Sequence, residues 1–133
     1  MTLQQLENTL KEIRNSSGKS YSELGTIGLQ YQTVAKIERG ENYTLSSLFR
    51  YINALDVSLY VFALPIPDLI AFGAILQKHR KEQYSLAELS LKIGLNATRI
   101  LAIEKGRGCE RKSLQKYLEI VPLEFNIKSI NHG

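Results

Sequence analysis

The chain contains a single cysteine, Cys109, among its 133 residues. An internal disulfide is therefore excluded, and so little cysteine is typical of proteins that stay in a reducing cytosol. Histidine is nearly as scarce, since only His79 and His132 are present, and neither belongs to a spacing typical of a metal-binding motif. We expect no metal site and no cofactor.

A membrane-spanning segment is also lacking. The longest apolar stretch runs from Val57 to Leu76, which is about the length that crosses a bilayer. Pro65, Pro67 and Asp68 interrupt its middle, where a proline breaks a helix and a carboxylate is costly. The N-terminus has no charged segment followed by an apolar run and a cleavage site, which argues against a secretory signal. We expect a cytoplasmic protein without a membrane partner.

Charge is modest and unevenly placed. Residues 1–67 hold six basic and six acidic side chains, whereas residues 68–133 hold eleven basic and seven acidic ones. The second part therefore carries the whole net charge of +4. A basic half suggests an anionic partner, although an excess of this size also suits solubility alone.

The same sequence signature occurs twice, 66 residues apart. The segment from Gly28 to Gly40 (GLQYQTVAKIERG) is matched by the segment from Gly94 to Gly106 (GLNATRILAIEKG). The correspondence extends outward to the pairs Arg14/Arg80, Ser47-Leu48/Ser113-Leu114 and Tyr51/Tyr117. A period that covers whole supersecondary units indicates duplication. We therefore predict two small domains, residues 1–67 and residues 68–133, which stabilise each other because each is near the lower size limit for a core.

Each predicted domain begins with four helices. In the first, Thr2 and Ser20 open capping boxes, Gly28 turns the chain, a third helix covers residues 30–39, and Thr44 caps a fourth. The second domain follows the same plan, with helices capped at Asp68, Ser85 and Asn96 and a fourth helix over residues 113–120.

A short strand is predicted after each set of helices. Residues 59–64 are β-branched and aromatic and end at a proline, and residues 125–130 lie in register with them. We expect these strands to pair antiparallel about a pseudo-two-fold axis and to join the halves as subunits are joined in a symmetric dimer. The alternative is that one or both segments are coil.

The spacing within each repeat is typical of a helix-turn-helix, in which the second helix packs across the third so that the third can enter the DNA major groove. A small residue in the second helix, Gly25 or Ser90, would allow that approach. Gly28 or Gly94 would adopt the positive φ of the turn. Only three residues separate Leu24 from Gly28, so the turn of the first repeat is expected to be tighter than that of the second, which has four.

On these residues, and on the closing segments Ile-Glu-Arg-Gly (37–40) and Ile-Glu-Lys-Gly (103–106), the chain resembles the lambda-repressor-like helix-turn-helix family of Cro and xenobiotic-response-element type. The resemblance implies a mainly α fold in two tandem copies. It also implies a transcriptional regulator or an antitoxin that binds double-stranded DNA, normally as a symmetric dimer. Some members dimerise through a strand that follows the fourth helix.

The resemblance also places the groove-facing positions. In the first repeat, Gln can pair with adenine and Lys can reach guanine. In the second, Leu101 and Ala102 cannot hydrogen-bond a base edge, and nearby Lys105, Arg107, Arg111 and Lys112 lie where family members hold phosphate. The predicted DNA-binding residues are Gln30, Tyr31, Gln32, Thr33, Ala35, Lys36, Arg39, Asn96, Thr98, Arg99, Lys105 and Arg107. The alternative is that these polar residues form a solvent-exposed helix face that binds no DNA.

Two other functional classes compete with a sequence-specific DNA-binding repressor or activator. A protein-interaction module, an antitoxin or anti-activator, would use outward Leu101 and Ala102 to bind a toxin or another protein. An enzyme is the weakest hypothesis: Glu38 and Glu104 have no partner at catalytic spacing, and Cys109 has no nearby histidine although basic neighbours could lower its pKa. We expect no catalytic residue. A further homodimer of the fused unit is left open.

Overall fold

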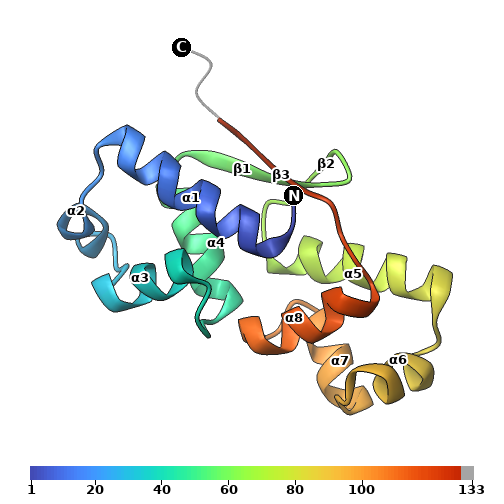
Figure 1. The fold of residues 1–133 in the computed structure, drawn as a ribbon. Helices are drawn as coiled ribbons and strands as arrows, with labels where there is room; N and C mark the ends of the chain where they lie inside the picture. Colours follow the sequence, from blue (N-terminus) through green and yellow to red (C-terminus); the bar gives the residue numbers. More distant parts are fainter. Residues whose placement is uncertain (130–133) are drawn as a thin grey trace.

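The computed structural model describes residues 1–129 and is mainly helical, with a small antiparallel sheet along one side (Figure 1). In chain order the elements are α1 (Leu3–Ser17), α2 (Tyr21–Gly25), α3 (Tyr31–Arg39), α4 (Leu45–Ala54), β1 (Val57–Val61), β2 (Leu64–Pro65), α5 (Leu69–Gln83), α6 (Leu86–Ile93), α7 (Ala97–Glu104), α8 (Arg111–Ile120) and β3 (Phe125–Ser129). No helix in this part of the chain is both long and apolar enough to cross a membrane.

The predicted helix starts are confirmed. Thr2, Ser20 and Ser85 each form a reciprocal capping box with the Gln or Glu three residues later. The side chains of Thr44, Asp68 and Asn96 also cap their helices. Two starts are shifted: α3 begins at Tyr31, with Gln30 as its N-cap, and α8 begins at Arg111 and not at Ser113.

The turns before α3 and α7 need glycine, because Gly28 and Gly94 have φ of 89° and 71°. The expected tighter turn in the first repeat is wrong: residues 26–30 connect α2 to α3, whereas only residues 94–96 connect α6 to α7. The predicted role of Gly25 is wrong: it is exposed, with no atom within 4 Å of the position that a Cβ would take. The close approach lies instead at Gly73 in α5, where a Cβ would come within 2.4 Å of the Glu104 carbonyl oxygen at the end of α7.

The sheet has the order β2-β1-β3, and β1 pairs antiparallel with β3 from Val57↔Ser129 to Val61↔Phe125. The predicted antiparallel pairing is therefore confirmed. The predicted extent of the first strand is wrong, because β1 ends at Val61 and the chain reverses through Phe62 and Ala63 at φ of 47° and 67°. Apolar composition hid this hairpin, whose turn is of the kind that usually requires glycine or asparagine. Ile130 and His132 lie outside the described residues.

Backbone pairing also occurs between the segments that precede α4 and α8. Thr44 and Glu110 form an isolated antiparallel bridge. On either side of it, Leu45 N–H donates to Cys109 C=O and Arg111 N–H donates to Tyr43 C=O, both at 2.8 Å. Thr44 and Glu110 are 66 residues apart, as are Tyr60 and Asn126, which face each other within the β1–β3 ladder.

One apolar core contains side chains from both halves of the chain. It extends from Leu3 and Leu6 of α1 to Leu114 of α8 and Phe125 of β3. At its centre the ring of Phe72 lies 5.9 Å from that of Phe49 and 6.2 Å from that of Phe125. Because Phe49 comes from the first half and Phe72 from the second, the two halves bury apolar surface against each other.

Candidate nucleic-acid interface

The helix α3 is held in place by one buried carboxylate at its last turn. Glu38 accepts hydrogen bonds from Arg14 Nε of α1 at 2.6 Å, from Tyr21 of α2 at 2.8 Å and from Tyr51 of α4 at 2.5 Å. Burial alone would raise the pKa of Glu38, but the hydrogen bonds from Arg14, Tyr51 and Tyr21 outweigh it and lower the pKa. The ionised carboxylate therefore ties the first three helices of this half to its fourth.

The same arrangement recurs 66 residues later. Glu104, at the end of α7, accepts from Arg80 Nε at 2.9 Å, from Arg80 Nη2 at 2.8 Å and from Tyr117 at 2.5 Å. Burial and the neighbouring carboxylate raise the pKa of the Tyr117 hydroxyl, so it stays a donor. Both glutamates are thus occupied in fixing a helix.

The polar face of α3 points away from the core. Gln30, Gln32 and Lys36 are exposed, and Thr33 is half-buried. Tyr31 is 56% exposed, and its ring lies edge-on to that of Tyr21 at 4.6 Å between centroids. This contact fixes the position of the Tyr31 ring while leaving its surface open to a ligand.

Two predicted residues of the first repeat need revision. Ala35 is wrong as a groove-facing position, because it is only 5% exposed. Helices α1, α2 and α4 all pack against α3, so the covered sector is wide and includes Ala35 beside Val34. Arg39 is exposed as expected but forms an ion pair with Glu41, which offsets part of its charge.

The corresponding face of α7 offers fewer groups that could contact DNA. Thr98 and Arg99 are exposed, whereas Leu101 and Ala102 are half-buried and not fully outward as predicted. Asn96 is exposed, but its side-chain oxygen accepts from Arg99 N–H at 2.8 Å and is committed to capping the helix. Lys105 and Arg107, the predicted phosphate-holding residues, are both exposed.

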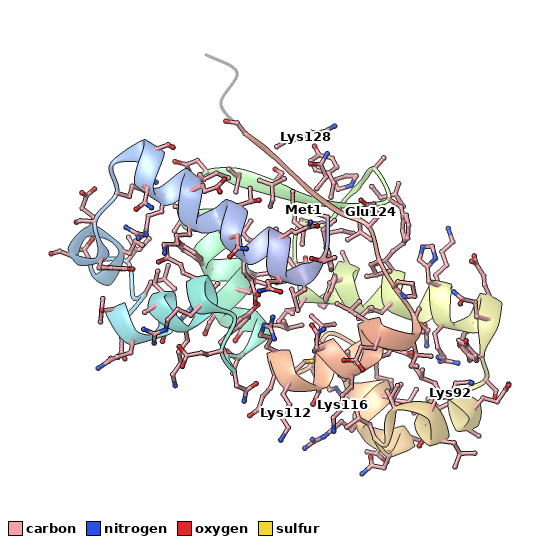
Figure 2. The ribbon with its side chains drawn as sticks, in the orientation of Figure 1. Met1, Lys92, Lys112, Lys116, Glu124 and Lys128 are labelled. Atoms are coloured by element: carbon pink, nitrogen blue, oxygen red, sulfur yellow. The ribbon has the colours of Figure 1, made fainter. Side chains whose placement is uncertain are left out.

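Beyond α7, the basic residues expected to hold phosphate differ in whether they are free to bind an anion. Arg111 donates two hydrogen bonds to buried Glu7 and is not free to bind an anion. Lys112 is exposed, and Figure 2 shows it projecting from α8 together with Lys116 on the side of the molecule opposite Lys128 and the sheet. Lys112 and the half-buried Lys116 therefore remain available in addition to the exposed Lys105 and Arg107.

Two shallow hollows connect these surfaces. One is lined by Thr33, Lys36, Asn42, Tyr43, Thr44 and Glu110, and the other by Thr44, Arg99, Gly108, Cys109, Glu110 and Ser113. Both include the Thr44–Glu110 bridge, so α3 and α7 border a common surface on either side of it. Figure 1 places α3 and α7 on the side of the molecule away from the sheet.

Asn42 is a contributor that the sequence analysis missed. Its amide nitrogen donates to Glu110 at 3.1 Å, and its oxygen accepts from Lys112 N–H at 3.1 Å. The signal that could have found it is the pairing of positions 44 and 110, which brings the loop before α4 onto the start of α8.

Cys109 does not behave as a reactive thiol. It is 6% exposed, and burial raises its pKa to about 12. The thiol is therefore protonated at neutral pH, contrary to the expectation that basic neighbours could lower its pKa.

Comparison with known families agrees with this geometry. Residues 10–62 match the helix-turn-helix family model. The match covers most of the first half, from within α1 to just beyond β1, and it suggests a DNA-binding transcription regulator of the Cro/C1 type. Searches of curated proteins and of solved structures found no match. Within the matched segment, α2 and α3 occupy the places of the two helices of a helix-turn-helix, the second of which is the recognition helix in that motif.

Proposed function

We propose that the protein is a sequence-specific regulator that binds double-stranded DNA through two helix-turn-helix units, residues 1–67 and residues 68–133, fused in one chain. The observation that carries the proposal is the exposed polar face of α3, on which Gln30, Gln32 and Lys36 project from a helix fixed at its other end by Glu38. A protein of this kind acts by binding, and we assign it no catalytic residue.

The pairing of equivalent residues supports the two-unit arrangement. A residue on a two-fold axis lies opposite its own copy. Thr44 faces Glu110 and Tyr60 faces Asn126, and each pair is separated by one 66-residue period. Around the first pair, the bond from position 45 to 109 is mirrored by the bond from 111 to 43. Two such points support the proposal of one pseudo-two-fold axis, with α3 on one side and α7 on the other.

The two recognition helices would contribute different contacts. Gln30 and Gln32 can each pair with an adenine edge, and Lys36 can donate to guanine, so α3 would specify base sequence. Thr98 and Arg99 are the residues of α7 that could reach a base. Lys105 and Arg107 would bind phosphate, which adds affinity without sequence preference.

The expected binding site is consequently asymmetric. If α3 and α7 enter successive major grooves on one face of the duplex, they contact half-sites about 34 Å apart. The half-site under α3 would be strongly specified and the half-site under α7 only weakly. A symmetric dimer would instead prefer a palindrome.

Selection from a pool of random-sequence duplexes tests this proposal. We expect one specified half-site, with enrichment lost in Gln32→Ala and retained in Lys11→Ala, an exposed α1 position away from the recognition helix. Binding of the duplexes without enrichment of any sequence, or no binding even at low salt, would contradict the proposal.

A protein-interaction role, as an antitoxin or anti-activator, is the second candidate. Leu101 and Ala102 support it less than expected because they are half-buried, but Leu91 on α6 is 87% exposed and Ile70 is 69% exposed. Co-purification of a defined partner that survives high salt would favour this role, because contacts with DNA weaken steeply with salt.

A further inference from the structure

We propose that Glu7, Tyr43 and Arg111 form a pairing lock that makes the first half of the chain associate with the second half and disfavours association between like halves of two chains. The proposal rests on the two-unit arrangement proposed above. It does not depend on DNA binding.

The lock is a buried, fully bonded cluster between the halves. Glu7 of α1 is 1% exposed and accepts from Arg111 of α8 twice, from Nε at 2.6 Å and from Nη2 at 2.9 Å. The Tyr43 hydroxyl, in the loop before α4, donates to the same carboxylate at 2.5 Å. Gly40 packs against the cluster, since a Cβ there would lie 3.1 Å from Glu7 Oε1.

The equivalent positions on the other side of the axis carry none of this chemistry. Adding 66 to Glu7 gives Gly73, and adding 66 to Tyr43 gives Cys109. Subtracting 66 from Arg111 gives Leu45, which is 1% exposed within the core. The cluster therefore occurs on one side of the pseudo-two-fold axis, and small or apolar groups occupy the other.

Pairing of like halves would break the cluster. If two first halves paired about the same axis, each Glu7 would face a Leu45, and two carboxylates would be buried without a cation. If two second halves paired, each Arg111 would face a Gly73 and lose its carboxylate. Removing one partner of a buried ion pair is strongly unfavourable, so both like pairings are penalised relative to the pairing within one chain.

Covalent linkage alone does not account for this preference at high concentration. A short connection gives the second half an effective concentration in the range of about 1 mM, so chains at comparable concentration could exchange halves. The lock would maintain pairing within the chain under those conditions, and the DNA-binding unit would be a single chain with one fixed order of its recognition helices.

Disulfide trapping of full-length chains tests the proposal. The reporter is Thr44→Cys in a Cys109→Ala background, because position 44 lies on the axis and meets another position 44 only when two first halves pair. Refolding at about 1 mM chain followed by oxidation should leave the reporter monomeric on non-reducing gels. Addition of Glu7→Leu, Tyr43→Phe and Arg111→Leu should raise the disulfide-linked dimer about tenfold or more, because the penalty on like pairing is removed.

A matched variant controls for general loss of stability. Arg80→Leu, Glu104→Leu and Tyr117→Phe remove a comparable buried cluster that lies within one half, and they should leave the dimer fraction low. Should the triple lock variant fail to fold, Glu7→Gln with Arg111→Gln replaces it with the same expectation. Equal cross-linking with and without the lock would overturn the proposal. Failure of the two-unit arrangement is separately visible, because Thr44→Cys with Glu110→Cys would then form no disulfide within one chain.

Discussion

Glu38 illustrates how one residue fixes the orientation of α3, the proposed recognition helix. Its carboxylate receives donors from α1, α2 and α4, and all three donor side chains are long enough to reach it from separate elements. Arg, Glu and Tyr recur at constant spacing in both repeats, but spacing alone could not show that these side chains meet. The half-burial of Leu101 and the burial of Ala35 were not predictable, because they depend on how widely neighbouring helices cover α3 and α7.

The Glu38 cluster predicts acid sensitivity. Because its pKa is lowered in the folded state, the unfolded chain takes up the proton first as pH falls below about 4.5, so this stabilisation is present at neutral pH and is lost on acidification. Glu38→Gln should lower the free energy of unfolding by about 3 kcal/mol at pH 7 and by much less at pH 3. Urea unfolding across this pH range measures the effect, with exposed Glu12→Gln as the control. An equal loss at both pH values would contradict the assignment.

The residues proposed to contact bases, Gln32 and Lys36, should have an effect on binding that is separable from that of phosphate contacts. Lys36→Ala and Gln32→Ala should each weaken binding to the selected site by about 1–3 kcal/mol while changing non-specific binding little. Lys105→Ala should weaken all duplexes to a similar degree and reduce the dependence of affinity on salt. Fluorescence titrations with specific and scrambled duplexes distinguish the two classes, and a Lys36→Ala effect equal on both duplexes would count against base readout.

At the level of elements, capping residues and glycine turns made the helices predictable. Local chemistry decides those positions, since a Ser or Thr followed three residues later by Glu or Gln satisfies the free N–H groups of a helix start whatever lies around it. The hairpin at Phe62 and Ala63 was missed because tertiary contacts, including the Phe62 ring 4.6 Å from that of His79, hold a turn that the residues themselves disfavour. The close packing of α5 on α7 at Gly73 was also missed, because it depends on which helices meet in the folded chain and not on local sequence.

Alanine substitutions at Gly73 and Gly25 test whether the close helix contact lies at α5 or at α2. Gly73→Ala should destabilise the protein by about 1–3 kcal/mol, because its Cβ would meet the backbone of Glu104 and the helices would have to separate. Gly25→Ala should instead stabilise it by about 0.5–1 kcal/mol, because the added methyl meets nothing and reduces the freedom of the unfolded chain. Thermal or denaturant unfolding of both variants gives the comparison. The opposite order of stabilities would contradict the packing described here.

For the whole molecule, the 66-residue period predicted two strands in antiparallel contact, and the β1–β3 ladder, which pairs Tyr60 with Asn126, agrees with that period. What the period could not reveal is the asymmetric content of the interface. The Glu7–Arg111 pair joins positions 104 residues apart whose counterparts are a glycine and a leucine, so no repeated signal marks it.

A disulfide across the axis should join the halves without distortion. Thr44 and Glu110 form an antiparallel pair whose neighbouring backbone bonds leave them in the closer type of facing position, within the range that a disulfide spans. In a Cys109→Ala background, Thr44→Cys with Glu110→Cys should oxidise within one chain and raise stability by about 4 kcal/mol relative to the same protein reduced. Mass spectrometry and melting of the oxidised and reduced forms check this, and disulfides found only between chains would contradict it.

A hydroxyl-radical footprint on the selected site tests whether α3 and α7 of one chain lie on the same face of a DNA duplex. We expect one bound chain per duplex and two protected windows separated by one helical turn, with Gln32→Ala weakening protection on that site and Lys11→Ala leaving it intact. A single window, or two windows that require two chains, would contradict it.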